Sequence, residues 1–110
     1  MEIKEDKSTS AYIVQVEGRV DAATAPDLEK KLHDLFESQE RKFLIDLTNM
    51  EYISSVGLRV LLQLAKKIKT SSGQVILCGL QDQVYEVFEI SGFTSIFSIC
   101  SNQEEALKQF

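Results

Sequence analysis

The sequence has no apolar run that approaches the roughly 20 residues needed to span a lipid bilayer. Its beginning, from Met1 to Lys7, is mostly charged and lacks the apolar core of a secretory signal. We therefore expect a protein that stays in the cytoplasm and does not insert into membranes. Basic residues are also in deficit, with 12 Lys and Arg against 17 Asp and Glu and a formal charge of −5. A general nucleic-acid binder needs a basic face, so this balance argues against such a role.

The side chains that most often act in catalysis or metal binding are scarce. His33 is the only histidine, and it lies about 140° around its expected helix from Leu28, so it should face solvent. Cys78 and Cys100 fit no metal-binding or redox spacing, and their apolar neighbours predict that both thiols are buried. The sequence contains no phosphate-binding glycine loop, zinc spacing or Gly-x-Ser-x-Gly elbow. We therefore expect no enzyme activity, no metal and no cofactor.

Strand-like and helix-like segments alternate along the chain. Proline occurs once, at Pro26, and no repeat or linker interrupts the sequence, so residues 1–110 should form one domain. β-forming residues and short apolar runs predict strands at 2–7, 11–17, 43–47, 75–78 and 96–99. Apolar residues at helical spacing predict helices after Thr24, from 55 to 69, around 84–88 and after Ser101. This order predicts an α/β fold with a central mixed sheet of four to five strands and about four helices.

Two of these helices have a capping-box pattern at their start. Thr24 is followed three residues later by Asp27, and Ser101 by Glu104. In such a box the side chain of each of the two residues accepts a hydrogen bond from the backbone N–H of the other. We therefore expect Thr24 and Ser101 to cap their helices.

The segment from Leu44 to Arg59 is the most informative part of the sequence. A buried strand runs into a loop, and the loop opens a helix at two adjacent serines, Ser54 and Ser55. Such a helix start exposes unpaired backbone N–H groups and the positive end of the helix dipole. A serine here commonly accepts one backbone hydrogen bond, which stabilises the helix by about 1 kcal/mol. One cap needs only one serine, so the second hydroxyl is open to another role.

Three stretches of the chain, in order, resemble the STAS domain family, which includes sulfate transporters and anti-sigma factor antagonists. Residues 18–25, Gly-Arg-Val-Asp-Ala-Ala-Thr-Ala, resemble the family's Gly-x-aliphatic-Asp loop before the first helix. Residues 45–47 and 52–58 resemble its central signature, and residues 91–93, 96–97 and 105–107 resemble its C-terminal pattern. The resemblance covers essentially the full length and implies a STAS-like fold.

The resemblance implies an anti-sigma factor antagonist that binds an anti-sigma factor serine kinase and releases the sigma factor. Phosphorylation by that kinase switches the antagonist off, and a phosphatase resets the phosphoserine. Alignment on Gly57 and Leu58 places the acceptor at Ser55, with Ser54 as its rival. The chain departs from the family's common pattern, because Ser54 replaces an aspartate and Val56 replaces a second hydroxyl residue.

The same resemblance implies a partner-binding surface around this helix start. Its residues are Asp21, Thr24, Ser54, Ser55, Val56, Gly57, Arg59 and Gln63. Asp21 has a second interpretation, because a short acidic side chain three residues before Thr24 can simply order the turn. Asp46 is either a buried acceptor that organises its loop or a partner contact, and we favour the structural role. The alternative function is a non-switching STAS module, either a scaffold of a stress-signalling assembly or an accessory of a membrane transporter, in which the serine pair is only a cap.

Overall fold

The computed structural model describes all 110 residues of the chain. Its strands are β1 (Glu2–Lys7), β2 (Tyr12–Val20), β3 (Lys42–Asp46), β4 (Met50–Ile53), β5 (Gln74–Cys78) and β6 (Ser98–Cys100). Its helices are α1 (Ala25–Glu37), α2 (Ser55–Thr70), α3 (Asp82–Ile90) and α4 (Gln103–Leu107), with a 3-10 turn, η1 (Phe93–Ser95). None of these helices has both the length and the apolar character required to cross a membrane.

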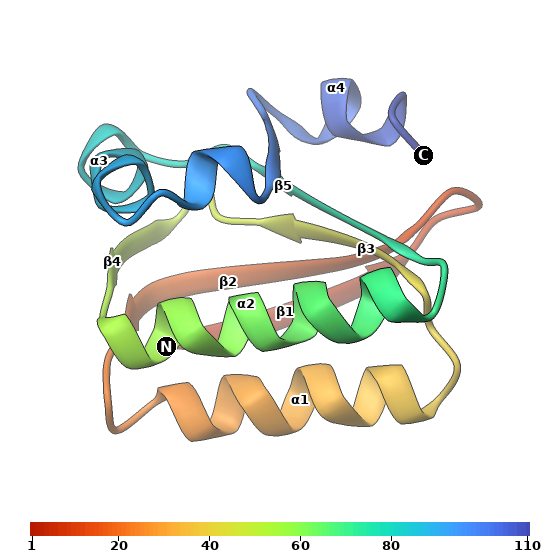
Figure 1. The fold of residues 1–110 in the computed structure, drawn as a ribbon, viewed down its shortest axis with the longest axis horizontal. Coiled ribbons are helices and arrows are strands. Elements are labelled where there is room, and N and C mark those ends of the chain that lie inside the picture. The colour runs from red at the N-terminus through yellow and green to blue at the C-terminus, as the bar shows by residue number, and fades with distance from the viewer.

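The strands form one mixed sheet, so the predicted α/β class is confirmed. β1 and β2 pair as an antiparallel hairpin, and all other neighbours are parallel. The strand order is β1-β2-β3-β5-β6, and β4 pairs with the last part of β2. α1 and α2 lie side by side on one face of the sheet, and α4 covers the opposite face (Figure 1).

The apolar core has two parts, one on each face of the sheet. The larger part lies between the sheet and α1, α2 and α3, and it contains Phe43 and Ile45. The smaller part lies under α4 and contains Leu44 and Ala106. Successive residues of a strand point to opposite faces, so β3 supplies side chains to both parts. This burial on both faces explains why residues 43–47 form an almost continuous apolar run.

β4 is a sixth strand, where the sequence analysis predicted four to five strands and assigned this segment to a loop. β2 is nine residues long, and it pairs first with β3 and then with β4. The register of the second pairing shifts between Gly18 and Arg19, where Gly18 has a positive φ of +85°. β4 has only four residues, of which two are exposed, so it has no apolar alternation that identifies a strand. The prediction of a plain loop was wrong.

The predicted capping boxes do not form. Thr24 precedes α1, but its side chain makes no capping hydrogen bond. α4 is capped by Asn102, whose Oδ1 accepts from the Glu105 N–H at 2.9 Å, one residue later than the predicted pair. Asparagine is as good a cap as serine, so the two adjacent candidates could not be separated by residue type.

The two cysteines differ in burial. Cys78 is buried, as predicted, but Cys100 is only half-buried. Cys100 lies on β6, which is an edge strand and is therefore covered less completely. The two residues are register partners on adjacent strands, a proximity that their distance in the sequence does not indicate.

Candidate functional site

The starts of α1 and α2 lie close together because the strands that lead into them are parallel neighbours. β2 and β4 pair so that Val20 lies beside Ile53. The Ser54 N–H continues this pairing and donates to the Val20 carbonyl oxygen at 2.8 Å. The loop of residues 21–24 therefore lies beside Ser54 and Ser55, at the end of the molecule where both helices begin (Figure 1). We refer to this region as the α2 start site.

Ser54 is the N-cap residue of α2. Its backbone is extended, with φ −85° and ψ 171°, and its Oγ accepts a hydrogen bond from the Gly57 N–H at 3.2 Å. The residue is half-buried. The expectation that one of the two serines caps the helix is confirmed, and the structure assigns that role to Ser54.

Ser55 is the first residue of α2 and is exposed to solvent. Its hydroxyl forms no hydrogen bond within the chain, because the capping position is already taken by Ser54. Arg59 lies one helical turn further on; it is also exposed and forms no ion pair within the chain. The first turn of α2 contains no acidic residue. The position is therefore favourable for an anion on the Ser55 oxygen, because the helix dipole, the free N–H groups and the Arg59 guanidinium all stabilise negative charge there.

Asp21 and Thr24 form a closed hydrogen-bonded loop. The Asp21 Oδ1 accepts from the N–H groups of Ala23 at 3.0 Å and Thr24 at 3.1 Å. In return, the Thr24 Oγ1 accepts from the Asp21 N–H at 2.9 Å. This engagement explains why Thr24 does not cap α1. The backbone hydrogen bond from Thr24 is the main reason that the pKa of the Asp21 carboxyl lies below its ordinary value. Asp21 is therefore a negative charge on the loop beside the start of α2.

The remaining residues predicted for the partner-binding surface differ in exposure. Val56 is half-buried against the large core, and Gly57 is buried. A Cβ atom on Gly57 would lie 2.8 Å from side-chain carbons of both Ile53 and Val20. The glycine therefore lets α2 approach the sheet closely and does not itself face outward. Gln63 is exposed and lies towards α1, so it is at the margin of the α2 start site.

An exposed aromatic residue beside the site was not found from the sequence. Tyr52, on β4, is 40 % exposed, and the Arg19 guanidinium carbon lies 4.3 Å from the centre of its ring. The two residues are register partners on β2 and β4. Arginine and tyrosine are enriched among the residues that contribute most to the binding energy of protein interfaces. Because β4 was not predicted, no sequence signal placed this pair next to the serines.

Asp46 has a structural role, as the sequence analysis interpreted it. It is 8 % exposed, and its Oδ1 accepts from the Thr48 N–H at 2.9 Å while its Oδ2 accepts from the Gln103 Nε2 at 2.7 Å. Burial alone raises the pKa of this carboxyl, but the hydrogen bonds from Thr48 and Gln103 outweigh it and hold the pKa below its ordinary value. Gln103 is 57 residues away in the sequence, so no local pattern could have identified it as the partner.

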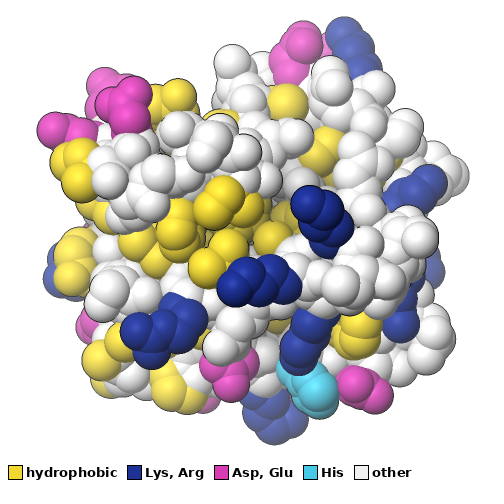
Figure 2. All heavy atoms as spheres, in the orientation of Figure 1, with side chains coloured by type: hydrophobic (Ala, Val, Ile, Leu, Met, Phe, Trp, Pro, Cys, Tyr) yellow, Lys and Arg dark blue, Asp and Glu magenta, His cyan; other side chains and the backbone are white.

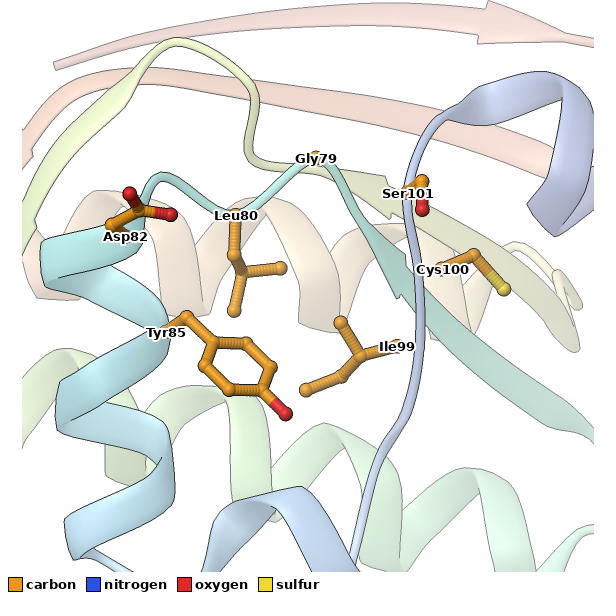
Figure 3. A pocket seen from close by; sticks show the side chains of 7 residues that line it. All are labelled: Gly79, Leu80, Asp82, Tyr85, Ile99, Cys100 and Ser101. Carbon is orange, nitrogen blue, oxygen red and sulfur yellow. The ribbon is translucent and has the colours of Figure 1, made fainter.

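A second concavity lies at the ends of β5 and β6 and is separate from the α2 start site. It has a volume of about 260 Å³, and α3 faces β6 across it. Figure 3 shows Asp82 and Tyr85 on α3, opposite Ile99, Cys100 and Ser101. Nowhere in the chain do three His, Cys, Asp or Glu side chains converge in a way that could hold a metal ion.

Comparison with known proteins gives a consistent result. The family model described as the STAS domain matches residues 1–106. BtrV of Bordetella bronchiseptica, a proposed anti-sigma factor antagonist, is 41 % identical over 110 residues, which is 100 % of this chain and 95 % of that protein. The anti-sigma-B factor antagonist of Listeria monocytogenes is 35 % identical over 100 residues, which is 90 % of this chain and 86 % of that protein.

Solved structures agree with the fold. A proposed anti-sigma factor antagonist from Thermotoga maritima superposes with a TM-score of 0.93 at 20 % identity, covering 97 % of this chain and 92 % of that chain. The Bacillus cell fate determinant SpoIIAA, solved in its phosphorylated form, superposes with a TM-score of 0.76 at 16 % identity, covering 98 % of each chain. At these identities the likeness concerns the fold alone.

Proposed function

The chain belongs to the STAS domain family, and we propose that it is an anti-sigma factor antagonist controlled by phosphorylation of Ser55. In its unmodified form it binds an anti-sigma factor serine kinase in the cytoplasm and thereby releases a sigma factor. The kinase transfers phosphate from ATP to Ser55, the complex dissociates, and a phosphatase restores the serine. The observation that supports this proposal best is that Ser55 has a solvent-exposed hydroxyl that no other group of the chain uses.

Ser55 is a better acceptor than Ser54 for a geometric reason. A kinase must bring its catalytic groups and the ATP phosphate in line with the hydroxyl that it modifies. The Ser54 Oγ is held by the Gly57 N–H and is half-buried, so its modification would break the cap of α2. The Ser55 hydroxyl can be reached without breaking any hydrogen bond of the chain.

A phosphate on Ser55 should be tolerated by the folded chain. It adds a charge of about −1.5 to −2 at neutral pH. This charge would lie at the N-terminus of α2, where backbone N–H groups and the helix dipole favour anions. Arg59, one turn further on and without an acidic partner, supplies a counter-charge within reach.

The same phosphate should prevent docking of the partner. The Asp21 carboxyl, whose pKa lies below its ordinary value of 3.8, is ionised at neutral pH, and its loop lies beside the start of α2. Phosphorylation therefore concentrates negative charge on this surface. At an interface that charge must be desolvated, and like charges in contact are unfavourable by several kcal/mol. A loss of about 4 kcal/mol weakens a complex roughly a thousandfold. Phosphorylation can therefore abolish binding without unfolding the protein.

The proposed partner-binding surface contains the eight predicted residues in two roles. Asp21, Ser55, Arg59 and Gln63 offer polar or charged groups to the partner. Ser54, Thr24, Val56 and Gly57 hold the helix start and the neighbouring loop in position.

The test is phosphorylation by the cognate anti-sigma factor kinase with ATP, followed by peptide mass spectrometry. We expect one phosphate, on Ser55, in the wild-type chain and none in Ser55→Ala, which should still bind the kinase. Ser54→Ala is the matched control and should still be phosphorylated. Phosphate on Ser54 would contradict the assignment of the acceptor. Tight binding without any phosphorylation would favour the non-switching module.

A further inference from the structure

An open apolar groove lies between α2 and the segment from η1 to β6. Its volume is about 560 Å³. Its apolar walls are formed by Leu62, Ala65, Ile68, Val75, Ile96 and Phe97. The side chain of Ile96 is 52 % exposed. Figure 2 shows apolar side chains gathered at the centre of this face, with Lys and Arg side chains beside them. A concave and exposed apolar surface of this kind can accommodate apolar side chains of another molecule.

The charges beside the groove are not neutralised by the chain itself. Lys66 and Lys69 border the groove and form no ion pair. Of the seven other lysines, the five on β1, on α1 and at the end of α4 pair with carboxylates, whereas Lys42 and Lys67 do not. α2 as a whole carries four of the 12 basic residues of the chain and none of its 17 acidic residues. The helix is therefore a basic strip on an otherwise acidic molecule.

This basic strip is continuous with the α2 start site. At 100° per residue, Leu62, Lys66 and Lys69 all lie within about 40° of Ser55 around the helix axis. With a rise of 1.5 Å per residue, the two lysines lie about 16 and 21 Å beyond Ser55 along that axis. A partner segment that contacts Ser55 and lies parallel to α2 will therefore reach the groove.

Building on the proposed function, we infer that the groove docks an acidic amphipathic helix of the anti-sigma factor kinase. Its apolar side chains enter the groove, as in other complexes in which a helix lies in an apolar groove. Its carboxylates, one helical turn apart, pair with Lys66 and Lys69, which have the same spacing. Charge complementarity selects this occupant, because an acidic segment is attracted to α2 and repelled by the rest of a chain with a net charge of −5.

An acidic partner also accounts for the effect of the proposed modification. A helix that presents carboxylates along α2 would bring the same charge towards Ser55. The carboxylates paired with Lys66 and Lys69 lie about 16 and 21 Å from Ser55, beyond the Debye length of about 8 Å. A phosphate on Ser55 therefore repels this partner through carboxylates that continue its helix towards the first turn of α2. The groove and the phosphorylation site thus act on one partner element.

The experiment measures phosphorylation of the chain by the purified cognate kinase at several substrate concentrations. The variant Lys66→Glu/Lys69→Glu reverses the two groove charges, and Lys4→Glu/Lys108→Glu makes the same change in net charge elsewhere. Ile96→Asp places a charge in the groove, and Ile90→Asp does so at a position that is 81 % exposed outside it. Circular dichroism establishes that all four variants are folded.

We expect both groove variants to raise KM by about tenfold or more, because the lost contacts serve binding. Their kcat should stay within about twofold of the wild-type value, since the groove is far from the reacting hydroxyl. Both control variants should behave as the wild type. Unchanged KM in the groove variants, or an equal rise in the controls, would overturn this inference while leaving the proposed function intact. A kinase that neither binds nor phosphorylates the wild-type chain would overturn the proposed function, and this inference with it.

Discussion

Ser54 and Ser55 are adjacent in the sequence, but their hydroxyl groups have different surroundings. The Ser54 Oγ accepts from the Gly57 N–H, whereas the Ser55 hydroxyl faces solvent without a partner in the chain. The difference follows from the backbone, because Ser54 is extended and Ser55 is already helical. One hydroxyl thus stabilises the fold, and the other is available for chemistry.

This division of roles predicts different effects on stability. Ser54→Ala should lower the free energy of unfolding by about 1 kcal/mol, because a backbone N–H at the helix start loses its acceptor. Ser55→Ala should change it by less than about 0.5 kcal/mol, as for most exposed substitutions. Urea unfolding followed by circular dichroism measures both. Equal losses in the two variants would show that Ser54 is not the sole cap.

Asp46 should make the stability of the chain depend on pH in the acidic range. Its hydrogen bonds lower its pKa below the ordinary value of 3.8, so the folded state binds a proton less readily than the unfolded state. The stabilisation is therefore complete above about pH 4 and is lost as the pH falls through the pKa of the folded state. At pH 7, Asp46→Asn should be less stable than the wild type by about 1–3 kcal/mol.

Unfolding experiments on the two proteins across this pH range test the assignment. The difference between wild type and Asp46→Asn should narrow as the pH is lowered. Glu104→Gln, an exposed change of the same kind on α4, is the control and should shift stability little at any pH. If the difference in stability between the wild type and Asp46→Asn stayed the same at acidic pH, the charge of the Asp46 carboxylate would not contribute to stability.

At the level of single residues, the sequence predicted the structural features that depend on local spacing. It identified the serine pair at a helix start, the exposed His33 and the loop role of Asp46, and all three are confirmed. It could not tell which serine caps, since that depends on where the helical backbone begins. It also missed Gln103, because this partner is brought to Asp46 only by the packing of α4 on the sheet.

Among the secondary-structure elements, the position of α2 depends on a close approach to the sheet at Gly57. The ideal position of a Cβ atom there is 2.8 Å from carbons of Ile53, on β4, and Val20, on β2. Both neighbours are buried and branched at Cβ, so they have little freedom to move away. A glycine in a helix is usually unfavourable. Here the close contact of α2 with both strands explains why position 57 is a glycine.

Gly57→Ala should therefore destabilise the chain, although alanine is the better helix former. We expect the free energy of unfolding to fall by about 1–3 kcal/mol, the usual effect of overpacking a core. The matched control is Gln63→Ala, on the exposed side of the same helix, which should be neutral. Thermal unfolding of the three proteins provides the measurement. A Gly57→Ala variant that is more stable than the wild type would show that α2 can move away from the sheet freely.

The elements themselves could be predicted to different degrees. The long helices and the buried strands have clear periodicity, and the structure confirms them near their predicted positions. β4 was missed because pairing with β2, and not its own four residues, makes it a strand. The predicted start of α4 was one residue too early, because Ser101 and Asn102 are both good capping residues. Strand order is a property of tertiary pairing, and no single segment encodes it.

For the whole molecule, charge is distributed unevenly over the surface. The chain carries a formal charge of −5, yet α2 contains four basic residues and no acidic ones. The α2 start site and the groove both lie on this helix, so the positive electrostatic potential of its basic residues extends over both. A charge added at Ser55 therefore changes the surface to which we propose that an acidic partner binds.

Phosphorylation should consequently affect binding and stability in different ways. A phosphate on Ser55 would lie at a helix N-terminus near Arg59, so the melting temperature should stay the same or rise by up to about 4 °C. Affinity for the kinase should fall roughly a thousandfold, because the partner must approach the added charge. Calorimetric melting and isothermal titration of the phosphorylated and unmodified chains measure the two effects.

The variant Arg59→Gln separates the two effects. In this variant the phosphate should stabilise the fold less, because the guanidinium is absent, but it should weaken binding as strongly as in the wild type, because the repulsion does not depend on Arg59. A melting temperature that falls by more than about 5 °C on phosphorylation would indicate that lost folding, and not electrostatic repulsion, releases the partner.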